Sequence, residues 1–286
     1  MACPAGVIAC TACSSGIVRR GDMERCVACG ASYPVVSGIP VLFGDLRGYL
    51  AERHSVGVQM MRSCGRDARE MVAAAMPADA GCDSRGASER RWAAIYQSGA
   101  DAGMYRHILD VAPPVSGHTV LEHGCSVGTF SRLLRDDGAE VTGVDASFPA
   151  LSMAARQGHD IRYVAADSAS LSCGMFDVVV SLNMLEIMEP RTLLGAMASR
   201  AARRVVVADP YDYSRGDRTV SGPMDGTAVR GFLRSMGFDI VAGTERPSFI
   251  PWEIHTFNSA FIGSTCMNIR EAHQGGHRAG ERRLAA

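Results

Sequence analysis

Apolar residues in the middle of the chain form short continuous runs separated by segments with helical spacing. The runs cover residues 118–122, 140–145, 161–165, 176–181 and 204–209. Runs of this length, rich in β-branched residues and bounded by glycines, predict strands that are buried on both faces. The strand–helix alternation predicts an α/β fold with a doubly wound, mostly parallel sheet. Ligands bind such sheets at the carboxyl ends of the strands.

The helical segments between these runs have recognisable ends. Val229, Phe232, Leu233 and Met236 fall at i, i+3, i+4 and i+7 of one helix, and Gly237 follows it. This is the spacing of an amphipathic helix closed by a glycine. The whole chain divides into four predicted parts: a Cys-rich module at 1–44, a helical linker or cap at 45–115, the strand–helix domain at 116–267 and a disordered tail at 268–286.

Composition narrows the classes of function. The 286 residues are 47% hydrophobic and 21% charged, which is typical of a globular protein. The formal net charge is −1, and this balance weighs against a nucleic-acid partner, which usually needs a concentrated basic surface. There is no lysine, so lysine-based catalysis is excluded. No apolar run is long enough to cross a membrane and no signal peptide is visible, so we expect a cytoplasmic protein.

Four cysteines near the start have the spacing of a metal site. Cys10 and Cys13 form one Cys-x-x-Cys pair and Cys26 and Cys29 form a second, 12 residues further along. Four thiolates arranged in this way suit tetrahedral zinc, and the residues between the pairs predict a β-hairpin. A module of this size buries too little surface to fold alone, so zinc would contribute to its folding. Two redox pairs or free thiols remain the alternatives.

The strongest candidate for a ligand site follows the strand at 118–122. Glu122 ends this strand, and a turn containing Gly124, Ser126 and Gly128 leads into a helix. Glycines allow a ligand to approach the backbone closely, and the helix start offers free N–H groups. Asp145 ends the next strand, 17 residues after Gly128, where a carboxylate can accept both hydroxyls of a ribose.

This segment resembles motif I of the class I S-adenosylmethionine (SAM)-dependent methyltransferases, with Ser126 in place of the middle glycine. Segments around Asp145, Asp167 and 176–186 resemble motifs II to IV, so the resemblance covers about half of the chain. It implies a Rossmann-like catalytic domain that binds SAM. The implied SAM-binding residues are Glu122, Gly124, Ser126, Gly128, Asp145, Ala146, Asp167, Ser168 and Asn183. We expect Ser126 to be tolerated if its backbone dihedral angles are ordinary.

Other interpretations of the same residues stay open. A glycine turn before a helix also occurs in NAD-binding proteins, although the Gly-x-Gly-x-x-Gly pattern is absent here. Residues 124–128 also match the Gly-x-Ser-x-Gly turn of hydrolases, with His255 as the late histidine. Asp145 and Asp167 can each be helix caps when taken alone.

The Cys-rich module carries a second resemblance. Residues 33–43, which follow the last cysteine pair, are similar to the small zinc-ribbon activator protein that partners several methyltransferases. In that family this stretch packs on the catalytic domain. The resemblance therefore implies a built-in module that stabilises the catalytic domain or shapes its substrate site, without a need for nucleic acid.

Candidate catalytic residues lie after the later strands. Asn183 and Glu186 follow the fourth strand, Tyr211 follows the fifth, and His255 lies near the end of the domain. Methyl transfer mainly requires alignment and exclusion of water, with a general base where the acceptor carries a proton. Packing explains Tyr211 equally well, a helix-start carboxylate explains Glu186 equally well, and a structural role fits His255 better.

The sequence thus predicts a cytoplasmic SAM-dependent methyltransferase with structural zinc that acts on a small polar, amino-acid-like molecule of specialised metabolism. Three alternatives stay open. The first is a cyclase or lyase whose substrate is SAM itself and which releases methylthioadenosine. The second is an rRNA or tRNA base methyltransferase, and the third is a non-catalytic SAM-binding scaffold. The acceptor, the oligomeric state and the role of residues 45–115 are not determined by the sequence.

Overall fold

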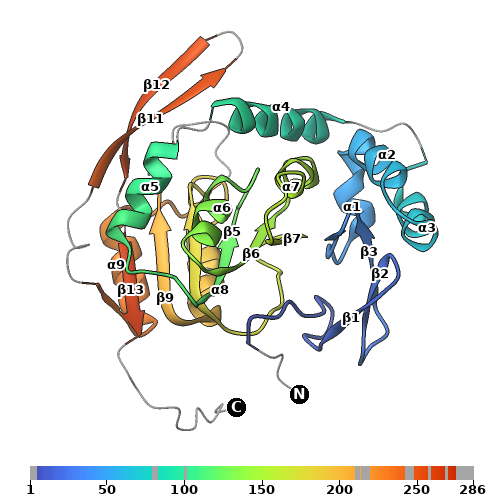
Figure 1. Ribbon diagram of the computed structural model, residues 1–286, viewed down its shortest axis with the longest axis horizontal. Coiled ribbons are helices and arrows are strands. Elements are labelled where there is room, and N and C mark those ends of the chain that lie inside the picture. Colours follow the sequence, from blue (N-terminus) through green and yellow to red (C-terminus); the bar gives the residue numbers. More distant parts are fainter. Residues whose placement is uncertain are drawn as a thin grey trace.

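The computed structural model describes residues 5–78, 83–99, 102–209, 213, 220–241, 248–256, 259–267 and 270–274. Figure 1 shows a central sheet with helices on both sides, and a smaller β-module beside one edge of it. Within the described part of the chain, no helix combines the length and the apolar character that a membrane crossing requires.

The main sheet has seven strands in the order β10-β13-β9-β8-β5-β6-β7. Five of them are parallel and correspond to the predicted runs: β5 (Thr119–His123), β6 (Glu140–Asp145), β7 (Arg162–Ala165), β8 (Phe176–Leu182) and β9 (Ala201–Ala208). The strand order reverses beside β5, because β6 lies on one side of it and β8 on the other. This arrangement confirms the predicted Rossmann-like α/β fold. Open α/β sheets of this kind bind ligands where the strand order reverses, which is here at the carboxyl ends of β5, β6 and β8.

Alternating residues of the strands form two separate apolar cores. Val178 and Val180 of β8 pack with Phe130 of helix α6 (Thr129–Asp136) and Ile108 of helix α5 (Ala102–Val111). Val179 faces the opposite side of the sheet, in a core shared with α8 (Pro190–Arg200) and α9 (Gly226–Ser235). Because successive side chains of a strand point to opposite faces, an uninterrupted valine run fits a sheet covered on both sides.

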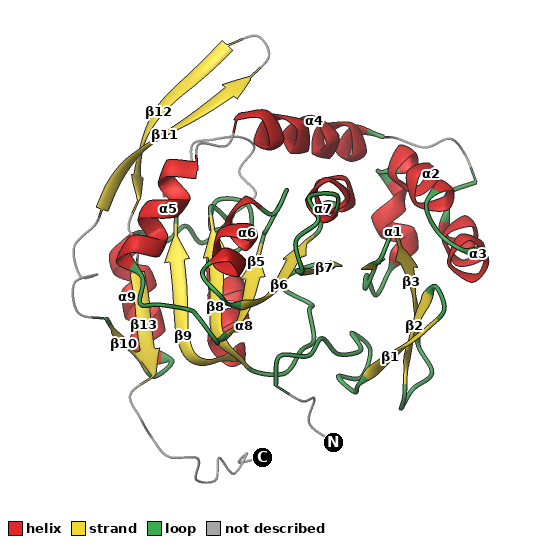
Figure 2. Cartoon of the chain, viewed as in Figure 1, coloured by secondary structure: helices red, strands yellow, loops and turns green. Residues whose placement is uncertain are grey.

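A small β-module and three helices precede the main sheet. Strands β1 (Ile17–Arg20), β2 (Met23–Cys26), β3 (Ser32–Val36) and β4 (Ile39–Pro40) form an antiparallel sheet, which confirms the predicted hairpin. Figure 2 shows the helices α1 (Leu46–Ala51), α2 (His54–Arg62) and α3 (Arg66–Ala75) above this sheet. We refer to residues 5–44 as the ribbon.

The ribbon is joined to the main sheet by backbone hydrogen bonds. The Leu42 N–H donates to the Ala165 carbonyl at 2.8 Å, and Val41 forms a parallel bridge with Ala165 of β7. The Ala9 N–H donates to the Ser172 carbonyl at 2.8 Å. The segment after β4 therefore covers the β7 edge of the sheet, which would otherwise expose unpaired backbone groups.

Helix α4 (Ser84–Gly99) and α5 lie between the ribbon helices and the sheet domain in the sequence. Ala93 of α4 packs against Val127 and Ala150, so α4 lies over the turn after β5 and over helix α7 (Phe148–Ala155). A hairpin of β11 (Ser248–Thr256) and β12 (Ser259–Met267) extends beyond the main sheet, next to α4 (Figure 1).

The prediction of a disordered tail from residue 268 is wrong for part of that segment. Strand β13 (Arg270–Gln274) is inserted between β9 and β10 (Phe238–Ile240), antiparallel to both. The strand pairs with Arg204–Val207 through backbone groups, and its mostly polar sequence carries no apolar pattern that would predict a strand. Long-range pairing of this kind depends on the available sheet edge, and local composition does not reveal that edge.

Leu194 tests the core on the α8 side of the sheet. The Leu194 side chain is fully buried, and Leu194→Ala is expected to lower the free energy of unfolding by about 2–5 kcal/mol. Urea denaturation followed by circular dichroism measures this change. The matched control is Ile187→Ala, because Ile187 is 63% exposed and its truncation is expected to change stability by less than about 0.5 kcal/mol. Equal effects of the two substitutions would contradict the assignment of the core.

Candidate functional site

The turn between β5 and α6 is built from backbone in the left-handed region. Gly124, Ser126 and Gly128 have φ angles of 71°, 49° and 72°. The N–H groups of Gly124 and Cys125 both donate to the Val144 carbonyl of the neighbouring strand, at 2.8 and 3.1 Å. The turn is thereby fixed to β6, and α6 begins directly after it at the carboxyl end of β5.

Two of these glycines lie in crowded surroundings as well as in the left-handed region. A Cβ atom on Gly124 would clash with the Met184 side chain, and one on Gly128 would clash with the Tyr163 hydroxyl, so these side chains would have to move. Ser126 departs from the expectation of ordinary dihedral angles, because its φ of 49° is left-handed. For a residue other than glycine, this left-handed conformation is less stable than the right-handed one by about 1 kcal/mol. The Ser126 N–H donates to the Asp145 carboxylate, and this bond helps to hold the left-handed conformation.

Glu122 is a carboxylic acid buried at the end of β5. Its side chain is 3% exposed and accepts a hydrogen bond from the Ser131 hydroxyl of α6. Burial, with a smaller contribution from the charge of Asp145, raises the pKa of Glu122 to about 7. The carboxyl group is therefore close to half-ionised at neutral pH, so a cation placed beside it would favour the charged form.

Asp145 connects two loops at the end of β6. One carboxylate oxygen accepts the Ser126 N–H at 2.8 Å and the other accepts the Ser147 N–H at 2.7 Å. Burial raises the pKa of Asp145, and the backbone donors oppose this rise. Asp145 and Glu122 thus lie at the ends of adjacent parallel strands, as the sequence predicted.

The remaining predicted SAM-binding residues follow β6 and β7. Ala146 is exposed directly after Asp145. Asp167 is exposed and accepts the Ala169 N–H at 3.1 Å, whereas Ser168 is buried. Because β6 and β7 are paired in parallel, these residues lie at the same edge of the sheet as Asp145.

Asn183 and Glu186 follow β8 at the same edge. Asn183 has a φ of 57°, and its backbone N–H donates to the Ala208 carbonyl at 2.9 Å. The buried Asn183 Oδ1 has no hydrogen-bond partner among the described residues. Glu186 is half-buried in the loop that follows. The Asp209 carboxylate accepts the Leu185 N–H at 2.8 Å and so fixes this loop to the end of β9.

Two predicted catalytic residues fall outside what the structure describes. Tyr211 lies outside the described residues. His255 belongs to β11, where its backbone pairs with Ala260 of β12, and its side chain is also outside the described part. Neither residue therefore has a structural role assigned to it, and the hydrolase interpretation that relied on His255 gains no support.

The four predicted metal ligands come together at the end of the ribbon. The Sγ atoms of Cys10, Cys13, Cys26 and Cys29 all lie within 4.8 Å of one another. The Cys10–Cys29 and Cys13–Cys26 sulfur distances are 3.7 and 3.4 Å, and all four residues are free thiols. Tetrahedral zinc with Zn–S bonds of about 2.3 Å places its sulfurs about 3.8 Å apart, so the spacing fits zinc. The Tyr33 hydroxyl lies 3.1 Å from the Cys10 sulfur, where it can orient that ligand.

Sequence reasoning missed several polar groups near the strand ends. Ser131 bonds to Glu122 from the first turn of α6, and no sequence motif marks it. His123 is 1% exposed, and neither ring nitrogen has a hydrogen-bond partner in the described part of the chain; burial lowers its pKa to about 4. Tyr49 reaches the Asp145 loop from helix α1. The separation of 97 residues between Tyr49 and Ala146 left no local signal for this contact.

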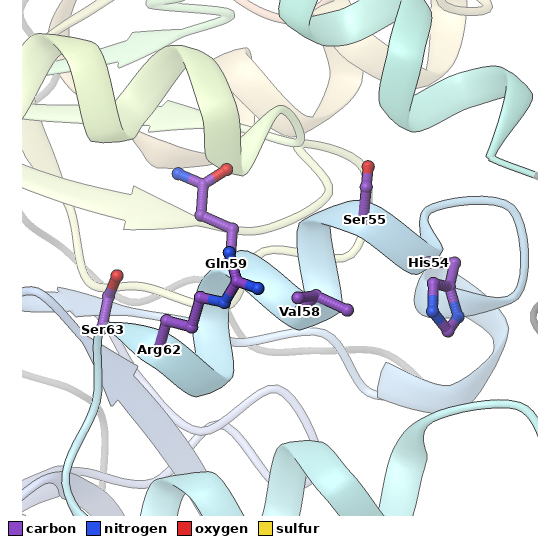
Figure 3. Close-up of a pocket in the computed structure, with 6 residues that line it drawn as sticks. All are labelled: His54, Ser55, Val58, Gln59, Arg62 and Ser63. Carbon is purple, nitrogen blue, oxygen red and sulfur yellow. The ribbon is translucent and has the colours of Figure 1, made fainter.

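A hollow of about 360 Å³ lies elsewhere, along α2. Figure 3 shows the residues that line it: His54, Ser55, Val58, Gln59, Arg62 and Ser63. None of these belongs to the strand ends that carry the glycine turn and the carboxylates. The hollow is therefore separate from the candidate site.

The buried acid at Glu122 predicts a specific dependence of stability on pH. Its pKa is about 7 in the folded protein and close to 4.5 when unfolded, so the folded state holds one more proton between these values. The contribution of Glu122 to the free energy of unfolding is therefore largest below about pH 4.5. This contribution is lost as the pH rises through 7. Relative to wild type, Glu122→Gln is expected to gain about 3 kcal/mol between pH 4.5 and pH 8. Urea unfolding at several pH values tests this, and parallel curves for both proteins would refute it.

Comparison with known proteins agrees with the strand-end geometry. A family model described as a methyltransferase domain matches residues 120–207, which include β5 to β9. A ubiquinone biosynthesis O-methyltransferase of Thiobacillus denitrificans is 34% identical over 98 residues, which are 32% of this chain and 42% of the relative. A malonyl-[acyl-carrier protein] O-methyltransferase of Pseudescherichia vulneris is 49% identical over 53 residues, 18% of this chain and 21% of the relative. The chain thus spans less than half the length of these curated relatives.

Solved structures extend the likeness beyond the matched segment. The magnesium protoporphyrin IX methyltransferase of Synechocystis PCC 6803, solved with bound SAH, gives a TM-score of 0.50 at 21% identity and covers 68% of this chain and 95% of its own. A second solved structure is a chain from the complex of the Haloferax volcanii Trm112 methyltransferase activator with a methyltransferase. Its TM-score is 0.53 at 14% identity, and the match covers 68% of this chain and 97% of that chain. The protein therefore has the class I methyltransferase fold, and its residues 120–207 match the methyltransferase-domain family.

Proposed function

We propose that the protein is a SAM-dependent methyltransferase that acts on a small polar molecule. The observation that carries the proposal is the joint placement of Glu122, Asp145 and the left-handed turn at 124–128 at one edge of the sheet. This edge offers close backbone approach, free N–H groups at the start of α6 and a carboxylate at the ribose position. The match of residues 120–207 to the methyltransferase-domain family supports the same conclusion.

The electrostatics of the strand ends suit SAM in particular. SAM carries a positive sulfonium and a positive ammonium group. Glu122 and Asp145 both have raised pKa values, since both are desolvated and the charge of Asp145 disfavours ionisation of Glu122. A cationic ligand relieves this repulsion and restores both charges. The absence of the Gly-x-Gly-x-x-Gly pattern disfavours the NAD interpretation.

The acceptor is proposed to be a small molecule with a hydroxyl or carboxyl group. The curated relatives named above are O-methyltransferases by name, although they match only in part. Glu186, half-buried after β8, is the proposed general base for a hydroxyl acceptor, and Asn183 is proposed to orient the donor or the acceptor through its unpaired Oδ1. In-line transfer to the acceptor oxygen breaks the S–CH₃ bond and leaves S-adenosylhomocysteine (SAH).

The alternative functions are less well supported than methyl transfer to a small molecule. The family model and the relatives are methyltransferases, which favours methyl transfer over cyclisation or elimination within SAM. The balanced charge weighs against an rRNA or tRNA substrate. The intact carboxylates at Glu122 and Asp145 weigh against a scaffold without activity.

We propose that the ribbon binds structural zinc through Cys10, Cys13, Cys26 and Cys29. The sulfur distances and the phenol at Cys10 support this assignment. Zinc here would hold the two cysteine pairs together and so position the segment after β4 against β7. All four positions are taken by protein ligands, which is typical of a structural rather than a catalytic zinc site.

The SAM chemistry is tested by mass spectrometry of purified protein with SAM, first alone and then with a panel of small hydroxy acids, phenols and carboxylates. SAM is expected to remain intact alone. One class of acceptor is expected to gain a methyl group while SAH forms in equal amount. The control is Asp145→Asn, which removes one ribose acceptor and is expected to slow product formation at low SAM. Release of methylthioadenosine from SAM alone would refute methyl transfer.

Zinc is tested by elemental analysis and chelation. The protein is expected to carry about one zinc per chain, and the Cys13→Ser/Cys29→Ser variant is expected to carry none. Loss of zinc is expected to lower the midpoint of thermal unfolding, because metal binding contributes to the folding free energy of such modules. Cys64→Ser is the control, since Cys64 lies outside the cluster and should retain full zinc. Zinc content unaffected by the double substitution would disprove the site.

A further inference from the structure

The ribbon side of the molecule contributes a side chain to the candidate SAM site. Tyr49 lies on α1, which follows the ribbon in the chain, yet its hydroxyl reaches the loop after β6. We propose that Tyr49 is a positioning residue for SAM binding, which acts by holding the Asp145 loop in the geometry that presents the carboxylate to the ribose. The inference rests on the proposed SAM-binding function.

The Tyr49 hydroxyl makes two hydrogen bonds, one on each side of Ser147. It donates to the Ala146 carbonyl at 2.9 Å and accepts the Phe148 N–H at 3.4 Å. Ser147 itself donates its N–H to the Asp145 carboxylate at 2.7 Å. The phenol therefore fixes the backbone segment whose central N–H orients the carboxylate.

The Tyr49 ring is held by groups on both sides of it. Its centroid is 3.8 Å from that of Phe43, with the two planes 12° apart. The guanidinium carbon of Arg53 lies 4.4 Å from the Tyr49 ring centroid, and the same guanidinium donates to the Tyr49 carbonyl at 3.1 Å. Only 8% of Tyr49 is exposed. A side chain fixed in this way can position a loop because it loses little freedom when a ligand binds.

Arg53 extends the connection to the helix above the site. Its Nε atom lies 2.7 Å from a Glu89 carboxylate oxygen on α4, and the two side chains are only 10% and 17% exposed. Burial raises the pKa of Glu89, and the charge of Asp145 adds to this rise, so the Glu89 and Asp145 carboxylates lie close enough to interact. Tyr49 thus lies where α1, α4 and the Asp145 loop meet.

The direct test measures binding of SAH to wild type and to Tyr49→Phe by isothermal titration calorimetry. Phenylalanine keeps the ring contacts with Phe43 and Arg53 and removes only the two hydrogen bonds. The Kd for SAH is expected to rise about tenfold, which corresponds to about 1.4 kcal/mol. For SAM turnover with an identified acceptor, KM for SAM is expected to rise while kcat stays within about twofold, because Tyr49 does not touch the reacting atoms.

A matched control comes from Tyr213. Its hydroxyl donates to the Met224 carbonyl at 2.8 Å and accepts the Met224 N–H at 3.1 Å, so it makes the same pair of bonds in a different place. Tyr213→Phe is expected to cost a similar amount of stability but to leave the Kd for SAH unchanged. Thermal unfolding of both variants separates a loss of stability from a loss of binding.

A double-mutant cycle shows whether Tyr49 acts through Asp145. In an Asp145→Asn background, Tyr49→Phe is expected to weaken SAH binding by no more than about twofold, because the carboxylate that it positions is gone. A full tenfold effect in that background would refute the positioning role. Unchanged SAH binding by Tyr49→Phe in the wild-type background would also refute it, while leaving the proposed function intact. Failure of wild type to bind SAH would overturn both.

Discussion

The carboxylate of Asp145 accepts N–H groups from two loops, and the candidate site depends on this pair of bonds. One donor, Ser126, lies in the glycine turn after β5, and the other, Ser147, lies in the loop that begins α7. The bond to Ser126 helps to hold a serine in the left-handed region, where it is unfavourable. A ligand that takes hydrogen bonds from Asp145 thus acts on both loops at once.

The ribbon and the helix that follows it both contact this part of the structure. The ribbon segment after β4 covers the edge of β7, which fixes the sheet on the side where Asp167 follows. Helix α1, which comes next, carries Tyr49 to the Asp145 loop. A module that appears separate in the sequence is thus built into the wall of the site, and a metal bound at its far end would stabilise that wall.

Glu122 and Asp145 at the strand ends and Glu89 on α4 all have raised pKa values. Desolvation raises the pKa values of Glu122, Asp145 and Glu89 together, and the charge of Asp145 adds to the rise at the other two. Glu122 is buried, whereas Asp145 and Glu89 are half-buried and Glu89 is paired with Arg53. Desolvation of such carboxylates is costly in the absence of a cation. The cost is accepted at a binding site because a positively charged ligand offsets it, as SAM would.

The sequence by itself determined the parallel sheet, the glycine turn and the cysteine pairs, because each depends on spacing within a short stretch. The strand runs, Gly124 and Gly128, and the two Cys-x-x-Cys pairs are found where their local patterns placed them. Only the tertiary structure decided which distant groups meet. The insertion of β13 into the sheet, the left-handed backbone of Ser126 and the contact between Tyr49 and Ala146 all arise from neighbours far away in the chain. Such contacts form through packing and long-range hydrogen bonds, whose partners no local pattern specifies.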